Sequence, residues 1–325
     1  MGSRKTLIVL SFLALAFVVV FAAALGLSQA EKFVATRARK EFAALKPTID
    51  VTFEKVKINP FTRMLIFNGI EIRSPSFPDV LKIRAASAGG IDWKSIGEMI
   101  ETRKPVVPRH VYLAIYGLSV PVKWTGEKPA ETLYELGYDT LDLSASIGID
   151  VDTTTRNFAI DPLAIEIKDA GKFEFSIAFA NAILPTKADF DLVRKNPKAF
   201  VTERLPAYGD MALKSISVRY EDDSFVEKAT NLLVEQGEDH PVALLDLALE
   251  QPSNGREVAA APGPTFSRQA LVALRDFFEK PSAIGIRSSL AQPVPFASLL
   301  DEKAGGSIDE IARKLALQVE SRDDE

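Results

Sequence analysis

The hydrophobic pattern begins with one long apolar run and then changes to short alternating segments. Residues 7–27 contain no charged side chain. As a helix rising about 1.5 Å per residue, this run would span the roughly 30 Å hydrocarbon core of a bilayer, so residues 1–30 are predicted to form a membrane anchor. The bulky residues spaced along the run are Leu7, Phe12, Phe17, Phe21 and Leu27.

A cleaved signal peptide is the alternative for this run. Ser28 and Ala30 are small residues at the two positions that a signal peptidase inspects, and cleavage there would leave a soluble chain beginning at Glu31. The apolar region of a typical secretory signal has about 7 to 15 residues, and this run is longer. The length favours a retained anchor and leaves cleavage as the open alternative.

The charges that flank the run conflict with the favoured orientation. Arg4 and Lys5 precede it, whereas four lysines and arginines lie within residues 31–40. Counted literally, these charges would keep the bulk of the chain in the cytoplasm. Long domains translocate largely regardless of charge, however, so we expect the amino end inside and the bulk of the chain outside.

A helix is predicted next, over residues 31–46. Apolar residues recur there between charged ones at a spacing typical of an amphipathic helix, namely at Phe33, Ala38, Phe42 and Leu45. Pro47 ends the segment, because proline cannot continue a helix from the preceding turn. We expect this helix to be a stalk that continues the membrane anchor.

From residue 47 onward apolar and polar positions alternate, which predicts β-strands. Eight are predicted, over residues 51–58, 63–73, 83–91, 111–122, 141–152, 158–167, 173–179 and 212–220. The alternation changes phase at Gly69, where a β-bulge is predicted in the second strand, and again at Gly117. The turn signal at residues 169–171 predicts a hairpin, and residues 93–100 are predicted to form a short helix.

After residue 220 the apolar period becomes helical. Helices are predicted from Phe225 and over residues 240–250 and 267–279, closing strands over 282–287 and 314–320, a linker near 252–265 and a charged tail over 321–325. An anchor, many antiparallel strands and a mixed helical part in this order predict an α+β fold. We expect an antiparallel β domain over residues 47–220 and a mixed carboxy part over 221–325.

Composition narrows the function classes. The net charge is −5, so the chain lacks the basic balance typical of nucleic-acid-binding proteins. It contains no cysteine, which excludes disulfides, thiolate nucleophiles and Cys-ligated metal sites. Nucleic acid is therefore not an expected partner.

Few residues have the types and spacing that catalysis requires. The two histidines, His110 and His240, lie in different predicted elements without metal-ligand spacing, so surface or capping roles are expected. Carboxylates cluster at residues 221–223, where they could bind a hard cation or transfer protons. Capping of the helix that follows explains the cluster more simply. We therefore predict no enzyme, no catalytic residues, no metal and no cofactor.

One predicted strand carries an aromatic stripe. Alternation places Phe173, Phe175, Ile177 and Phe179 on the same face of the strand. Two interpretations are open for this stripe. It is either an ordinary packed core or the wall of a groove that binds lipid.

Two segments resemble a known family. The segment INPFTRMLIFNGIEIRSPS at residues 58–76 and the segment HVYLAIYGLSV at 110–120 resemble the region that follows the membrane helix in AsmA-like proteins of proteobacteria. In contrast, LKSISVRYEDDSF at 213–225 and FFEKPSAIGI at 277–286 resemble uncharacterised proteobacterial envelope proteins. The AsmA-like resemblance covers about the first third of the chain, and the chain is shorter than the larger members of that group.

The resemblance implies a location and a role. It implies a single-pass protein of the bacterial inner membrane with its bulk in the periplasm. It also implies an antiparallel sheet curled into a groove, which handles phospholipid or another envelope lipid, or supports outer-membrane biogenesis. The expected partners are the membrane, such a lipid and envelope proteins. The alternative is a structural or interaction module of an envelope complex that has no lipid ligand.

Overall fold

The computed structural model describes residues 30–46, 48–59, 62, 64–74, 79–90, 109–183, 187–199, 203–204, 208–250, 265–296, 298 and 307–321. The predicted anchor, with Leu7, Phe12, Phe17, Phe21 and Leu27, lies outside these residues, as do the predicted helix at 93–100 and the linker at 252–264. Among the helices in the described part of the chain, none has the length and apolar character needed to cross a membrane.

The fold is α+β, and the chain divides into two compact units. The amino-terminal unit contains residues 1–151 and 163–168, and the carboxy-terminal unit contains residues 152–162 and 169–325. Strand β6 (Asn157–Ile167) is divided between the two. Residue 220, where the sequence predicts the end of the β domain, lies within the carboxy-terminal unit.

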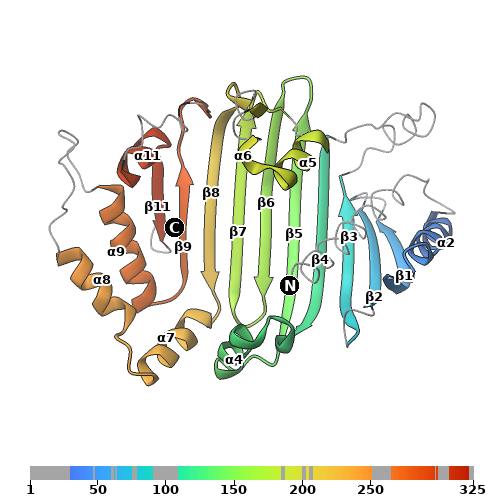
Figure 1. The fold of residues 1–325 in the computed structure, drawn as a ribbon, viewed down its shortest axis with the longest axis horizontal. Coiled ribbons are helices and arrows are strands. Elements are labelled where there is room, and N and C mark those ends of the chain that lie inside the picture. Colours follow the sequence, from blue (N-terminus) through green and yellow to red (C-terminus); the bar gives the residue numbers. More distant parts are fainter. Residues whose placement is uncertain are drawn as a thin grey trace. The chain divides into compact units, whose positions relative to one another are not determined.

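The amino-terminal unit is an open antiparallel sheet with its strands in chain order, β1-β2-β3-β4-β5, and helix α2 beside β1 (Figure 1). Its elements are α2 (Ala30–Ala43), β1 (Asp50–Asn59), β2 (Met64–Arg73), β3 (Leu81–Gly89), β4 (His110–Pro121), η1 (Val122–Trp124), α4 (Glu127–Glu135) and β5 (Thr140–Asp152). The five strands follow the alternation in the sequence, whereas the nine-residue helix α4 was not predicted.

A buried core lies between α2 and the sheet of this unit. Its least exposed members include Val34 and Ala38 of α2, Phe67 and Ile70 of β2, and Ala88 of β3. The ring of Phe53 meets those of Phe42 and Phe67 edge to face, with centroids 5.9 and 5.2 Å apart. The segment expected to be a stalk is thus a helix whose apolar stripe packs on β1.

The phase of alternation changes along one row that crosses four strands. Apolar residues three positions apart face the core in each strand: Phe53 and Val56, Phe67 and Ile70, Ile83 and Ala86, and Ile115 and Leu118. The row between them consists of Glu54, Gly69, Arg84 and Gly117, which are not paired in the strand ladders. Gly69 and Gly117 have φ of +61° and +62°, a backbone region that glycine adopts readily.

The bulge predicted in the second strand was wrong. Phe53 pairs with Ile70 and Lys55 with Asn68, so the register between β1 and β2 is the same on both sides of Gly69. Both strands change phase at the same row, and no extra residue is needed. The register shift lies instead between β4 and β5, after Ile115, because β5 keeps one phase along its length.

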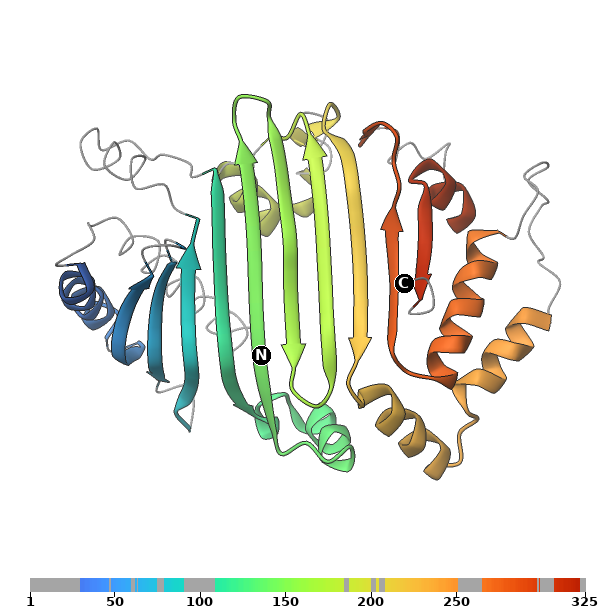
Figure 2. The ribbon, with the colours of Figure 1, turned by 180° about the vertical axis from the view of Figure 1, so that it is seen from behind.

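The carboxy-terminal unit contains a second antiparallel run of strands, β7-β8-β9-β11, with β10 paired to β8 (Figure 2). Its strands are β7 (Gly171–Ala180), β8 (Ala212–Asp222), β9 (Ala283–Ser288), β10 (Val294–Pro295) and β11 (Leu317–Ser321). Its helices are α5 (Lys187–Lys195), α6 (Pro197–Ala199), α7 (Phe225–Glu235), α8 (Pro241–Glu250), α9 (Phe266–Glu279) and α11 (Ile308–Lys314).

The long helices of this unit begin where the sequence indicated. The carboxylate of Asp222 accepts a hydrogen bond from the backbone N–H of Val226 at 3.0 Å, which satisfies a free donor in the first turn of α7. Thr265 caps α9 in the same way, through the N–H of Arg268. The short helices α5, α6 and α11 and the two-residue β10 were not predicted. The closing strand begins at Leu317, because residues 308–314 form α11.

Candidate functional site

The aromatic stripe lies on one face of β7, as alternation predicted. Residues on one face of an antiparallel pair meet their partners across the strands. Phe173 pairs with Tyr220, Phe175 with Val218, Ile177 with Ile216 and Phe179 with Leu213 of β8. The apolar stripe of β7 therefore continues onto β8.

The same face extends further, onto β9 and β11. Ile284 pairs with Tyr220, Ile286 pairs with Val218, and Val319 of β11 pairs with Ile286. We call this continuous surface the apolar face; it consists of Phe173, Phe175, Ile177, Phe179, Leu213, Ile216, Val218, Tyr220, Ile284, Ile286 and Val319.

The part of the apolar face on β7 is not packed as a core is. No residue of β7 is fully buried, and 39% of Phe173 is exposed. Across the row, Val218 and Ile216 of β8 are likewise only partly buried. Partly exposed aliphatic and aromatic groups in contiguous rows indicate a binding surface more often than isolated exposed residues do. The β7 and β8 rows are therefore the candidate binding site.

Helix α9 borders this surface and contacts β9 and β11. The ring of Phe277, buried on α9, meets Tyr220 edge to face with centroids 6.0 Å apart. The Tyr220 hydroxyl donates to Asp222 at 2.8 Å, so the polar tip of this residue is satisfied at the end of the strand. These contacts fix the edge of the apolar face next to α7 and α9.

The opposite face of the same strands is charged. Ion pairs join Lys172 to Glu174 at 2.7 Å, Arg219 to Glu221 at 3.0 Å, and Arg287 to Glu320 at 2.6 Å. Seryl residues lie between them, with Ser176 opposite Ser217. This run of strands therefore has one charged face and one apolar face. An apolar ligand would bind to the apolar face.

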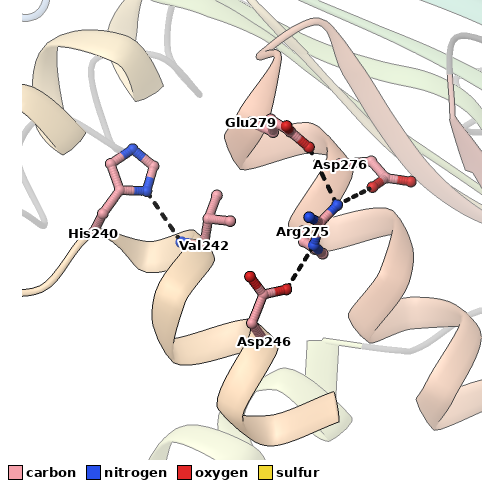
Figure 3. Close-up of polar contacts among 6 residues, drawn as sticks. All are labelled: His240, Val242, Asp246, Arg275, Asp276 and Glu279. Atoms are coloured by element: carbon pink, nitrogen blue, oxygen red, sulfur yellow. Dashed lines mark hydrogen bonds and ion pairs between the residues drawn. The ribbon is translucent and has the colours of Figure 1, made fainter. Parts of the chain in front are cut away.

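The residues considered for chemistry have structural partners. His110 forms an ion-pair contact with Asp150 on the neighbouring strand, with Nδ1 and Oδ1 2.6 Å apart. The ring of His240 accepts a hydrogen bond from the N–H of Val242 at 3.2 Å, at the start of α8 (Figure 3). Within the described residues, acidic side chains and histidines form no group of three that could hold a metal ion.

Two charged clusters had no clear signal in the sequence. Arg275 of α9 contacts Asp246 of α8 at 2.6 Å, and Asp276 and Glu279 of its own helix at 3.2 Å each (Figure 3). Hydrogen bonding to Asp246 is the main cause that raises the pKa of the Arg275 guanidinium. Because the partners lie 29 residues apart and on different helices, their spacing along the chain gives no hint of the contact.

The second cluster involves Asp189 of α5, which is almost fully buried. Its carboxylate accepts a hydrogen bond from Nε of Arg204 at 2.6 Å, which raises the pKa of Arg204. Burial, and then the negative charge of Asp189, raise the pKa of Tyr208. This cluster fixes the segment between β7 and β8 and is not part of the apolar face.

Comparison with known proteins gives one match. A family model described as an uncharacterized protein matches residues 164–322. The matched range begins within β6 and ends one residue after β11, so it corresponds closely to the carboxy-terminal unit that bears the apolar face. No curated protein and no solved structure matches the chain.

Proposed function

We propose that this protein is a membrane-anchored envelope protein that handles lipid through the apolar face of β7 and β8. The observation that carries the proposal is the exposure of that face. Phe173, Phe175, Ile177 and Phe179 form a contiguous apolar row, yet none of them is fully buried. Acyl chains gain free energy when they leave water, and contact with this row would remove apolar area on both partners from water.

The distribution of polar groups supports an apolar ligand. The charged face of the strands places its ion pairs away from the row, so an acyl chain on the apolar face would not desolvate them. A lipid groove needs apolar walls and few polar groups, which matches the side chains on this face. No catalytic residue is part of the proposal.

The proposed location rests on the sequence. The apolar run at residues 7–27 and the resemblance of residues 58–76 and 110–120 to AsmA-like proteins support a single-pass anchor in a bacterial inner membrane, with both units in the periplasm. A fusion of alkaline phosphatase after Glu325 should then be active. Fluorescence of a cytoplasmic reporter at the same position, with no phosphatase activity, would reverse the orientation and remove the envelope role.

The test of lipid handling compares two matched aspartates on opposite faces of the same strand pair. Phe175→Asp places a carboxylate on the apolar face, whereas Ser217→Asp places one on the charged face, opposite Arg287. Lipid that copurifies with the full-length protein in mild detergent is identified by mass spectrometry. We expect Phe175→Asp to remain folded and to lose the lipid, because acyl chains cannot solvate a charge, and Ser217→Asp to keep it.

Two outcomes would overturn lipid handling. The first is that Phe175→Asp unfolds the carboxy-terminal unit, which would make the row a packed core. The second is that Phe175→Asp folds and retains the same lipid as the unmodified protein. Either result would favour the alternative of an interaction module without a lipid ligand.

A further inference from the structure

Helix α8 is apolar on two sides. Its half-buried residues Val242, Leu245, Asp246 and Leu249 recur at helical spacing, and α8 packs against α9. Leu244 and Leu247 lie outside this stripe and are 53% and 57% exposed. A helix that is apolar all round is normally buried on all sides. The inner stripe of α8 is explained by α9, whereas the outer stripe is not.

Besides the packing of its inner stripe, α8 is joined to α9 by an ion pair. Arg275 of α9 reaches across to Asp246 at 2.6 Å (Figure 3). This contact orients α8 so that the side containing Asp246 faces α9, and Leu244 and Leu247 remain on the side that faces solvent. The outer stripe is therefore presented on a helix that is already held in place.

The segment of the chain that contains the outer stripe carries charges of one sign. Between residues 229 and 250 there are five carboxylates and no lysine or arginine. Asp246 is paired with Arg275, and the others are Glu235, Glu238, Asp239 and Glu250, all of which are exposed. Exposed apolar side chains on an acidic segment match a partner with apolar residues along one side and basic residues beside them. The same charges oppose binding to an anionic membrane surface.

We propose that the outer stripe of α8 is a docking surface for a basic amphipathic helix of another protein. Leu244 and Leu247 contact the apolar side of that helix, and the carboxylates at residues 235, 238, 239 and 250 lie near its lysines and arginines. This surface is separate from the apolar face of β7 and β8, and it does not depend on lipid handling.

The test uses a designed probe and matched variants of the full-length chain in zwitterionic nanodiscs. The probe is a fluorescent helical peptide with leucines on one side and lysines beside them, and empty nanodiscs provide the background. We expect Leu244→Gln with Leu247→Gln to weaken binding by at least about tenfold, since two apolar contacts are lost. The control is Ile308→Gln with Ile311→Gln on α11, where Ile308 is 67% exposed, and binding should not change.

Charge is tested separately on the same surface. Glu238→Lys with Asp239→Lys should lower the association rate and reduce its dependence on salt, because the attraction to the lysines of the probe is removed. Glu127→Lys with Glu131→Lys on α4 is the control and should have no effect. A probe that binds equally to the α8 and α11 variants, or whose binding does not respond to salt, would overturn the proposal.

If the outer stripe of α8 were covered by another segment of this chain or by a second copy, labelling and self-association would show it. Because the chain contains no cysteine, Leu247→Cys provides a unique thiol for maleimide labelling. We expect it to be labelled as fast as a thiol introduced by Ile308→Cys. Slow labelling would mean that another segment of this chain covers the stripe. Self-association that disappears in the Leu244→Gln, Leu247→Gln variant would identify a second copy as the occupant. Either result would overturn a basic helix as the partner.

Discussion

The two units use apolar strands in different ways. In the amino-terminal unit, α2 places an apolar stripe over β1, and Phe67 and Ile70 are excluded from solvent. In the carboxy-terminal unit, β7 has an equally apolar stripe, but none of its residues is fully buried. The difference lies in what packs on the strands, not in the strands themselves. The first unit uses its apolar side chains for stability, and in our account the second keeps them accessible for a ligand.

The largest effect is expected in the amino-terminal unit. Phe67→Ala removes a fully buried ring that packs edge to face on Phe53, and we expect it to lower the free energy of unfolding by about 3 to 5 kcal/mol. Trp124 lies in this unit, and fluorescence during chemical denaturation follows its exposure. A loss of less than 1 kcal/mol would mean that this core is much looser than its burial indicates.

A smaller effect is expected where the alternation changes phase. Gly117 has φ of +62°, and a Cβ there would lie 3.0 Å from Cβ of Arg84. We expect Gly117→Ala to destabilise the amino-terminal unit by about 1 to 3 kcal/mol. Gly137→Ala is the matched control, because φ is +83° and nothing lies within 4 Å of the added carbon. Equal losses in the two variants would show that the contact with Arg84 is unimportant.

The corresponding truncation in the carboxy-terminal unit should be mild. Phe175→Ala removes a half-buried ring, so we expect a loss of about 1 kcal/mol or less in the free energy of local opening. Hydrogen exchange of the backbone amides in β7 and β8 measures this opening. A loss as large as that of Phe67→Ala would remove the difference between the units.

An effect confined to high pH concerns Tyr116 of β4, whose hydroxyl lies 3.3 Å from that of Tyr112. Burial, followed by this hydrogen bond, raises the pKa of Tyr116 from 10.0 to about 12. The unfolded chain loses this proton at lower pH than the folded chain does, so folding stability is unchanged below pH 10 and falls as the pH rises from 10 towards 12. Ultraviolet titration should find one of the six tyrosines ionising last, and Tyr116→Phe should remove that step.

Much of the fold follows from the period of the sequence. Uninterrupted alternation predicted β5, and the turn at residues 169–171 predicted the hairpin of β6 and β7. The phase change at Gly69 is visible in the sequence, but it does not by itself indicate a bulge. A bulge requires that the partner strand keeps its phase. Phe53 and Val56 show that β1 changes phase as well. Helix α4, which has only nine residues, was not predicted from its sequence.

The candidate site could be predicted only in part. Alternation correctly placed Phe173, Phe175, Ile177 and Phe179 on one face, because that depends on the strand alone. Their half-burial could not be predicted, since it depends on which helices pack on the face. The pairing of Arg275 with Asp246 and of Arg204 with Asp189 was also hidden, because each joins elements whose contact is decided by tertiary packing.

One measurement tests the contrast between the two units most directly. In a chain without cysteine, Ile177→Cys and Ile70→Cys each introduce a single thiol, one on the apolar face and one in the closed core. We predict that a maleimide labels the first rapidly in delipidated, folded, full-length protein, that added phospholipid slows this labelling, and that the second is labelled only after denaturation. Equal protection of both thiols in the delipidated protein would contradict an open apolar face.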